Sequence, residues 1–191
     1  MTPRILAFSG SIRRDSLNQK LVEIASNEVR KAGGEVTVIH LKDYQLPIFN
    51  QDLEDEEGLP TNLTTLKDLF RSHQGFLIAS PEYNSSVTSV LKNTIDWVTR
   101  PQEGFAPLDC FDGKIAAIMA TSPGARGGLV GLSAIRSILT HIKTTVIPLQ
   151  VAVPTAYEAL AGDDRVEPQR IHDMICQQAS QLVDATRRMH I

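Results

Sequence analysis

The sequence predicts an α/β fold built around a parallel β-sheet. Five apolar runs of strand length recur along the chain, and stretches of helical periodicity separate them. The runs are continuously apolar rather than alternating, which is typical of strands that helices cover on both faces. The expected strands are residues 4–8, 36–41, 75–79, 115–120 and 146–153. Because the 191 residues contain no evident linker or internal repeat, we expect a single domain over residues 1–191.

The segment after the first strand has the pattern of a helix packed on the sheet. Leu17, Leu21 and Ile24 lie on one stripe, and Gly33 and Gly34 are suited to end the helix in a left-handed conformation. The last helix repeats this apolar spacing at Ile171, Ile175, Leu182 and Met189.

A helix expected over residues 87–98 is apolar on more than one face. One stripe carries Val87, Leu91, Ile95 and Val98, and an adjoining stripe carries Val90, Thr94 and Trp97. The two stripes together form an apolar surface that is wider than the face a helix needs to pack on the sheet. We interpret the second stripe as a subunit interface, with Trp97 as a lone exposed aromatic residue as the alternative.

One long irregular connection is expected over residues 42–60, and connections of this length are often functional. We interpret it first as a lid or a dimer contact. Its acidic run, residues 52–57, fits a solvated surface or the charge at a helix start better than a metal site.

The composition excludes several classes of protein. The chain is 42% hydrophobic and 21% charged with a formal net charge of −3, so it has no basic excess for nucleic acid. Its apolar runs fall short of the ~20 residues that span a bilayer, and no leader pattern is present, so we expect a cytoplasmic protein with no membrane contact. Cys110 and Cys176 lie far apart and the histidines are scattered, so we expect neither a disulfide nor a metal site.

Polar or glycine-bearing turns follow three of the expected strands. These turns are "SGSIRRDSLN", "SPEYNSSVTS" and "TSPGARGG", and each one opens a helix. In the strand order 2-1-3-4-5 the first, third and fourth strands are neighbours, so the three turns form one rim at the carboxyl edge of the sheet. Ligands of open parallel sheets bind at this edge.

The first turn is suited to a phosphate group. Serine and asparagine donors gather at a helix start whose free backbone N–H groups attract anions, and Arg13 or Arg14 adds a positive charge. The turn lacks the lysine of a nucleoside triphosphate site and does not match G-x-G-x-x-G, so a terminal monophosphate fits best. Ser16 equally fits a simple helix cap, with Gln19 completing a capping box.

The second and third turns are suited to a flat ring. Residues 81–84 offer a stiff backbone, a tyrosine and an amide, although Tyr83 alone would also fit core packing. Residues 122–128 carry three glycines, which allow a backbone to approach a ligand closely but also occur in tight turns.

These segments resemble a known family. "GSIRRDSLN", "PEYNSSVTSVLKNTIDWVTR" and "TSPGARGG" are similar to signature segments of the NADPH-dependent FMN reductases, above all the bacterial branch of chromate and quinone reductases and azoreductases. The resemblance implies a flavodoxin-like three-layer sandwich, non-covalently bound FMN, NADPH or NADH as co-substrate, and homodimers or homotetramers.

The resemblance also implies roles for individual residues. The first turn would hold the FMN phosphate, the second would meet the ribityl chain and the ring, and the third would lie at the ring's far side. The residues that match these positions are Ser11, Arg13, Ser16, Asn18, Pro81, Glu82, Tyr83, Asn84, Ser122 and Gly124. The family usually has proline and glycine where this chain has Thr88 and Ser89, and we expect these two side chains to narrow or re-tune the acceptor pocket.

The function implied is an FMN-dependent NAD(P)H oxidoreductase that reduces a small-molecule quinone, flavin, chromate or azo acceptor. No side chain is expected to be catalytic, because the flavin ring itself accepts the hydride. The alternatives are a flavodoxin-like electron carrier and a flavin-based redox sensor, both without a nicotinamide site. A small phosphatase is excluded because neither cysteine is followed by an arginine at the required spacing.

Overall fold

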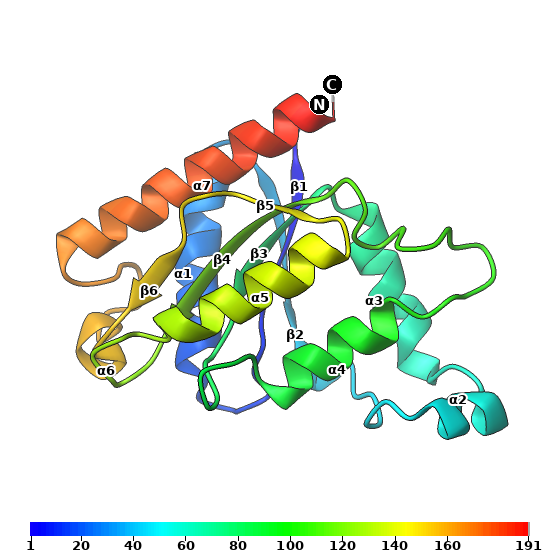
Figure 1. Cartoon of the computed structure of the whole chain (residues 1–191). Coiled ribbons are helices and arrows are strands. Elements are labelled where there is room, and N and C mark those ends of the chain that lie inside the picture. The colour runs from blue at the N-terminus through cyan, green and yellow to red at the C-terminus, as the bar shows by residue number, and fades with distance from the viewer. Residues whose placement is uncertain (191) are drawn as a thin grey trace.

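The central layer is a parallel sheet in the order β2-β1-β3-β4-β5, with β6 also paired to β4 (Figure 1). The computed structural model describes residues 1–190. Its strands are β1 (Arg4–Ser9), β2 (Glu35–His40), β3 (Gly75–Ala79), β4 (Ile115–Thr121), β5 (Thr145–Val146) and β6 (Val151–Val153). The predicted α/β class and strand order are confirmed.

Helices cover both faces of this sheet, as the continuously apolar strands predict (Figure 1). The helices are α1 (Leu17–Lys31), α2 (Gln51–Glu57), α3 (Thr61–Ser72), α4 (Ser89–Val98), α5 (Leu129–His141), α6 (Ala156–Ala159) and α7 (Gln169–Met189), with a short 3-10 turn at Leu41–Asp43. Alternate residues of β1 point into two separate cores: Ile5 packs with α1 and α7, and Leu6 packs with α3, α4 and α5. None of the described helices combines the length and the apolarity that a membrane crossing needs.

Helix α1 begins and ends where the sequence indicates. Ser16 caps its start by accepting a hydrogen bond from the backbone N–H of Gln19 (3.2 Å). The side chain of Gln19 donates to Glu23 and its oxygen accepts no hydrogen bond, so the expected capping box with Ser16 is not formed. At the far end, Gly33 has a φ of +89° and the N–H of Gly34 reaches back to the carbonyl of Val29, so the chain leaves the helix through a left-handed residue.

The expectation of one continuous strand over residues 146–153 is wrong, because the chain leaves the sheet between β5 and β6. Pro148 lies in this gap and has no N–H to donate to a neighbouring strand. Two side chains from opposite faces fill the gap. Arg136 of α5 donates to the carbonyls of Val146, Ile147 and Pro148. Gln178 of α7 donates to the carbonyls of Ile118 in β4 (2.9 Å) and Leu149 (2.8 Å).

In the second apolar stripe of α4, Thr94 and Trp97 are buried within the monomer and Val90 is partly exposed. Trp97 is fully buried, so its exposure is excluded, and its indole N–H donates to the carbonyl of Pro47 (2.8 Å). Its ring contacts Phe49 edge-on at 5.0 Å between centroids. The chain's own 42–60 segment therefore covers Trp97. Trp97 and Thr94 no longer indicate a subunit interface.

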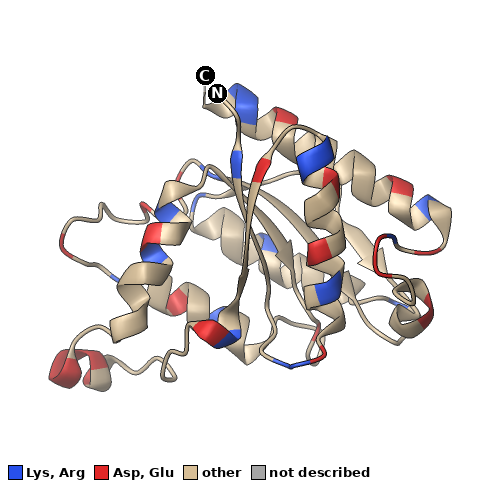
Figure 2. Ribbon diagram, turned by 180° about the vertical axis from the view of Figure 1, so that it is seen from behind, with Lys and Arg blue, Asp and Glu red and all other residues tan. Residues whose placement is uncertain are grey.

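The 42–60 segment itself is less irregular than expected, since it contains α2. Asn50 caps this helix, and Asp52 and Glu54 lie in its first turn (Figure 2). Acidic side chains at this end of a helix interact favourably with the helix dipole. Glu54 is anchored to the body of the protein by an ion pair with Arg100 (2.8 Å).

A second irregular connection, between α4 and β4, was not anticipated from the sequence. Residues 98–110 and Lys67 line a cavity of about 380 Å³ there. Lys67 is buried and donates to the carbonyl of Arg100 (2.6 Å). Burial raises the pKa of the neighbouring Cys110 thiol to about 11, as expected for an inert buried cysteine.

Replacing Gln178 by methionine tests whether its side chain stabilises the interruption between β5 and β6. We expect the free energy of unfolding to fall by about 1–3 kcal/mol, because two buried carbonyl groups lose their donor. Urea denaturation followed by circular dichroism measures the change. The matched control is Gln177→Met, which alters an exposed neighbour on the same helix and should change stability by less than about 0.5 kcal/mol. Equal effects of the two substitutions would contradict the interpretation.

Candidate functional site

The turns after β1, β3 and β4 are joined to one another by hydrogen bonds at the carboxyl edge of the sheet. The first joint lies between the β1–α1 turn and the residues that open α4. The hydroxyl of Thr88 donates to the carbonyl of Gly10 (2.6 Å), while the N–H of Gly10 donates to the carbonyl of Ala79 (2.9 Å). The same hydroxyl accepts from the N–H of Leu91 (3.2 Å), so Thr88 also caps α4.

The second joint connects the β1–α1 turn to the end of β4. The side-chain amide of Asn18 donates to the carbonyl of Thr121 (2.9 Å) and accepts from its N–H (3.0 Å). Asn18 is buried, so this pair of bonds lies in a region of low dielectric where it is stronger than in water. The amide therefore imitates one more strand pairing beyond the ends of the sheet.

The third joint connects the turn after β3 to the start of α5. A carboxylate oxygen of Glu82 accepts from the N–H of Gly131 (2.7 Å). Gly131 and Gly128 permit this approach, because a Cβ at Gly131 would lie 3.2 Å from the Cβ of Glu82 and one at Gly128 only 2.7 Å from the Cβ of Ala120. The predicted convergence of the three turns is thus a feature of the structure.

Within the first turn, the predicted phosphate residues have different environments. Arg13 is exposed, and Ser11 is partly buried and accepts from the N–H of Arg13 through its hydroxyl (3.3 Å). Ser16 and Asn18 are engaged inside the protein by the cap and by Thr121. Ser11 and Arg13 are consequently the residues of this turn that are free to face a ligand.

The second turn presents its polar groups to solvent. Tyr83 and Ser86 exchange two backbone hydrogen bonds of 3.0 Å, and Asn84 (φ +50°) and Ser85 (φ +63°) between them are both left-handed. This is the backbone of a type I′ turn, which a serine adopts only at a cost of roughly 1 kcal/mol. Tyr83 is 53% exposed, so its ring is not part of the core.

The glycines of the third turn divide into two groups. Gly127 is needed for the fold, because its φ is +59° and a Cβ there would lie 2.6 Å from the carbonyl carbon of Val153. Gly124 is exposed, and a Cβ there would meet nothing closer than the hydroxyl of Ser122, at 3.7 Å. Ser122 itself is fixed through its backbone to Val153 and Ala156. Gly124 is thus the glycine of this turn whose Cα is open to solvent and could be approached by a ligand.

Sequence reasoning missed the structural role of Thr88. It is only 2% exposed and its hydroxyl turns inward to Gly10, so it does not project into an acceptor pocket as expected. Ser89 is exposed and lines a groove of about 430 Å³ with Phe49 and Val90. A threonine directly before a helical stripe is a helix-cap signal, and that signal was available in the sequence.

Comparison with known proteins identifies this arrangement. Residues 3–158 match the family described as NADPH-dependent FMN reductase. The chain belongs to this family. An NAD(P)H-dependent FMN reductase of Pseudomonas aeruginosa is 31% identical over 190 residues, which cover 97% of this chain and 96% of that protein.

Other FMN reductase relatives match in sequence or in structure. Two rice proteins (Oryza sativa subsp. japonica) described as probable NADPH:quinone oxidoreductases are each 35% identical, but the alignments span only 58% and 61% of their length. In structure, the chain is similar to FerB, a flavoenzyme NAD(P)H:(acceptor) oxidoreductase from Paracoccus denitrificans. The TM-score is 0.80 at 28% identity, over 98% of this chain and 99% of that one.

The residues on the rim fit the cofactor of this family. The start of α1 offers free backbone N–H groups beside Arg13, which suits the phosphate of FMN. The exposed Tyr83 and the unobstructed Gly124 lie on the other two turns of the rim. The hydrogen bond from Thr88 to Gly10 holds the β1–α1 turn against the start of α4.

Replacing Thr88 by valine tests this hydrogen bond. We expect FMN to bind about tenfold more weakly, because the loss of a buried hydrogen bond costs about 1–2 kcal/mol and loosens both turns. Quenching of flavin fluorescence measures the dissociation constant. Thr88→Ser keeps the hydroxyl and should bind FMN nearly as well as the natural chain.

The matched control for Thr88 is Thr94→Val in the same helix. The buried hydroxyl of Thr94 donates to Val90 within α4 and touches neither turn. An equal loss of FMN affinity in both valine variants would show that Thr88 acts through helix stability alone.

Proposed function

We propose that the protein is an FMN-dependent NAD(P)H oxidoreductase that transfers a hydride from NADPH or NADH to a small-molecule acceptor, a quinone, flavin, chromate or azo compound. The observation that carries this proposal is the joining of three strand-end turns into one rim in a chain that belongs to the FMN reductase family. When bound, FMN supplies a ring that takes up a hydride from the nicotinamide and passes electrons to the acceptor.

The phosphate end of the cofactor would be held by the β1–α1 turn. Ser11 offers a hydroxyl and Arg13 a guanidinium, and the first N–H groups of α1 point out of the helix start. Ser16 and Asn18 would contribute indirectly, by fixing the helix start and the position of the turn. The phosphate-binding role of these four residues remains a prediction. In it, Ser11 and Arg13 contact the phosphate directly.

The ring end would lie between the other two turns. Pro81 is buried and Glu82 is bonded to Gly131, so they fix the turn from which Tyr83 and Asn84 project. On the opposite side, Ser122 and Gly124 would bring backbone close to the ring. Backbone N–H groups near Asn84 and Gly124 would stabilise the negative charge of a reduced ring, because their orientation is fixed before the ligand arrives.

A second copy of the chain would complete the site in a homodimer or homotetramer. Support comes from the groove beside Ser89, which Leu46, Phe49 and Val90 line and next to which Ile48 is 86% exposed. An exposed apolar side chain beside a groove is suited to contact with another protein surface. The single domain over residues 1–191 and the cytoplasmic location stay predictions.

Anaerobic addition of NADPH or NADH to the FMN-loaded protein tests the proposed activity. We expect the flavin absorbance to bleach on mixing, as the nucleotide reduces the bound flavin, and to return when a quinone is added. An electron carrier or a redox sensor without a nicotinamide site would keep its colour with both nucleotides. That outcome would overturn the oxidoreductase proposal while leaving FMN binding intact.

Substituting Arg13 tests the direction in which the cofactor lies. Arg13→Gln should weaken FMN by about tenfold or more, because a charge-assisted bond to a phosphate is worth about 1.5–3 kcal/mol. Riboflavin, which lacks the phosphate, should bind both proteins alike. Arg14→Gln is the matched control, since this neighbouring arginine is also exposed and lines a groove beside α1. A larger effect of Arg14 would reassign the phosphate contact.

A further inference from the structure

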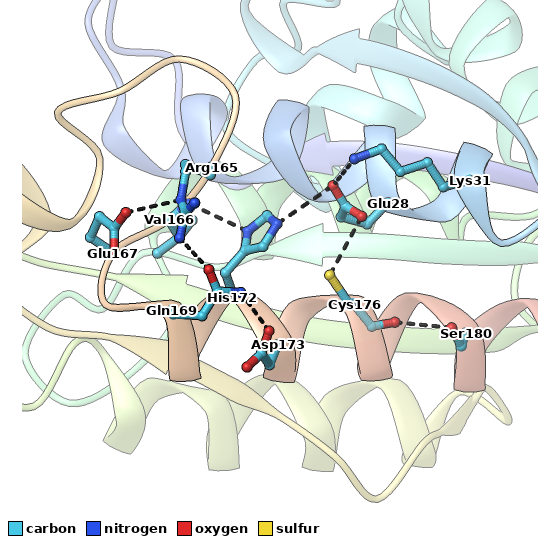
Figure 3. Close-up of polar contacts among 10 residues, drawn as sticks. All are labelled: Glu28, Lys31, Arg165, Val166, Glu167, Gln169, His172, Asp173, Cys176 and Ser180. Atoms are coloured by element: carbon cyan, nitrogen blue, oxygen red, sulfur yellow. Dashed lines mark hydrogen bonds and ion pairs between the residues drawn. The ribbon is translucent and has the colours of Figure 1, made fainter.

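A cluster of three side chains of the kinds that bind metal ions lies between α1 and α7 (Figure 3). Glu28 comes from α1, and His172 and Cys176 come from α7. The two residues of α7 are four positions apart, so they lie on the same face of the helix, one turn from each other. Among residues 1–190, these three bring one ligand atom each to within 4.8 Å of one another.

One side of the cluster is a hydrophobic core, which makes the presence of three such groups there unusual. The residues next to it along the two helices, Val29, Ile175 and Ala179, are all buried in one hydrophobic core. The side chain of Glu28 is only 7% exposed. A buried carboxylate is costly unless a cation compensates its charge.

The cation that pairs with Glu28 in this structure is Lys31, whose Nζ lies 2.7 Å from Oε1. The side chain of Lys31 is 69% exposed and reaches the carboxylate from the rim of the cluster. It can therefore swing into solvent at little cost. The inner side of Glu28 faces His172 and Cys176, which carry no fixed positive charge.

The distances within the cluster suit a tetrahedral ion. The Sγ of Cys176 is 3.5 Å from Oε2 of Glu28, and the Nε2 of His172 is 3.8 Å from Oε1. Zinc bonds of about 2.0–2.3 Å to sulfur, nitrogen and oxygen, at tetrahedral angles, place such ligand atoms about 3.4–3.6 Å apart. All three ligand atoms lie within 4.8 Å of one another, so the widest pair must close by at most about 1.3 Å to share one ion.

We propose that Glu28, His172 and Cys176 bind a single borderline-soft divalent cation of the zinc type, which fastens α7 to α1. A thiolate, an imidazole and a carboxylate are all zinc ligands, and hard cations such as Mg²⁺ do not favour this set. Water takes the fourth position. As the zinc–sulfur bond forms, the thiol proton of Cys176 passes to the solvent.

Coordination through Nε2 places the remaining imidazole proton on Nδ1. This ends the contact in which the N–H of Val166 approaches Nδ1 of His172 at 3.4 Å. That contact is at the long end of hydrogen bonding, so its loss is a small penalty. The family match covers residues 3–158, so Glu28 lies within it and His172 and Cys176 lie beyond it.

Calorimetric titration with Zn²⁺ tests the proposal on the FMN-loaded full-length chain, purified without a histidine tag. We expect one ion to bind per chain and the melting temperature to rise with Zn²⁺. Cys176→Ser and His172→Gln should each weaken binding by about tenfold or more. Lys31→Gln should strengthen it, because the competing cation is removed.

The controls separate this site from other thiol and imidazole groups. His40→Gln alters another histidine beside a glutamate, with Nε2 3.6 Å from Glu23, and Cys110→Ser alters the buried cysteine of the opposite core. Both variants should bind Zn²⁺ like the natural chain. The thiolate charge-transfer band of a Co²⁺ difference spectrum should appear in both and vanish in Cys176→Ser.

Absence of stoichiometric Zn²⁺ binding, or equal binding by a chain that carries both Cys176→Ser and His172→Gln, would overturn the proposal. FMN content and circular dichroism of each variant show that it is folded. Because the readouts are binding and stability, they do not depend on the proposed oxidoreductase activity.

Discussion

The paired hydrogen bonds between the side chain of Asn18 and the backbone of Thr121 are the interaction on which the site depends. They connect the beginning of α1 to the end of β4 across residues that are 103 positions apart in the sequence. Without them the first turn would be tied only to the turn after β3. Because the amide satisfies a buried donor and a buried acceptor at once, no other side chain of similar size replaces it. The position of the rim is therefore set by buried contacts beneath it rather than by the groups that face a ligand.

Much of the architecture could be predicted from the sequence, because each prediction rested on a local pattern. The burial of both sheet faces follows from continuous apolar runs such as residues 75–79 and 115–120. The broken fifth strand was missed, although Pro148 was visible. Its partners could not be read from the sequence, since Arg136 and Gln178 come from distant helices and act through their side chains.

The candidate site was predictable to a similar degree. The three turns do meet, but the pattern could not separate residues that face a ligand from residues that hold the turns. Asn18 and Ser16 are engaged with the protein itself, whereas Arg13 and Tyr83 are exposed. The second stripe of α4 shows the same limit: Trp97 is buried, but by residues 47–49 of the same chain. The spacing of apolar residues predicts that a helix face is buried, but it does not predict which segment or subunit buries that face.

The interruption between β5 and β6 also shapes how the molecule can meet other chains. An unbroken outer strand would present a row of free N–H and C=O groups, which is a template for unwanted strand addition and aggregation. Here the edge is split into two short pieces, and the arginine from α5 already occupies three of the intervening carbonyls. This border of the sheet is therefore blunted against amyloid-like growth.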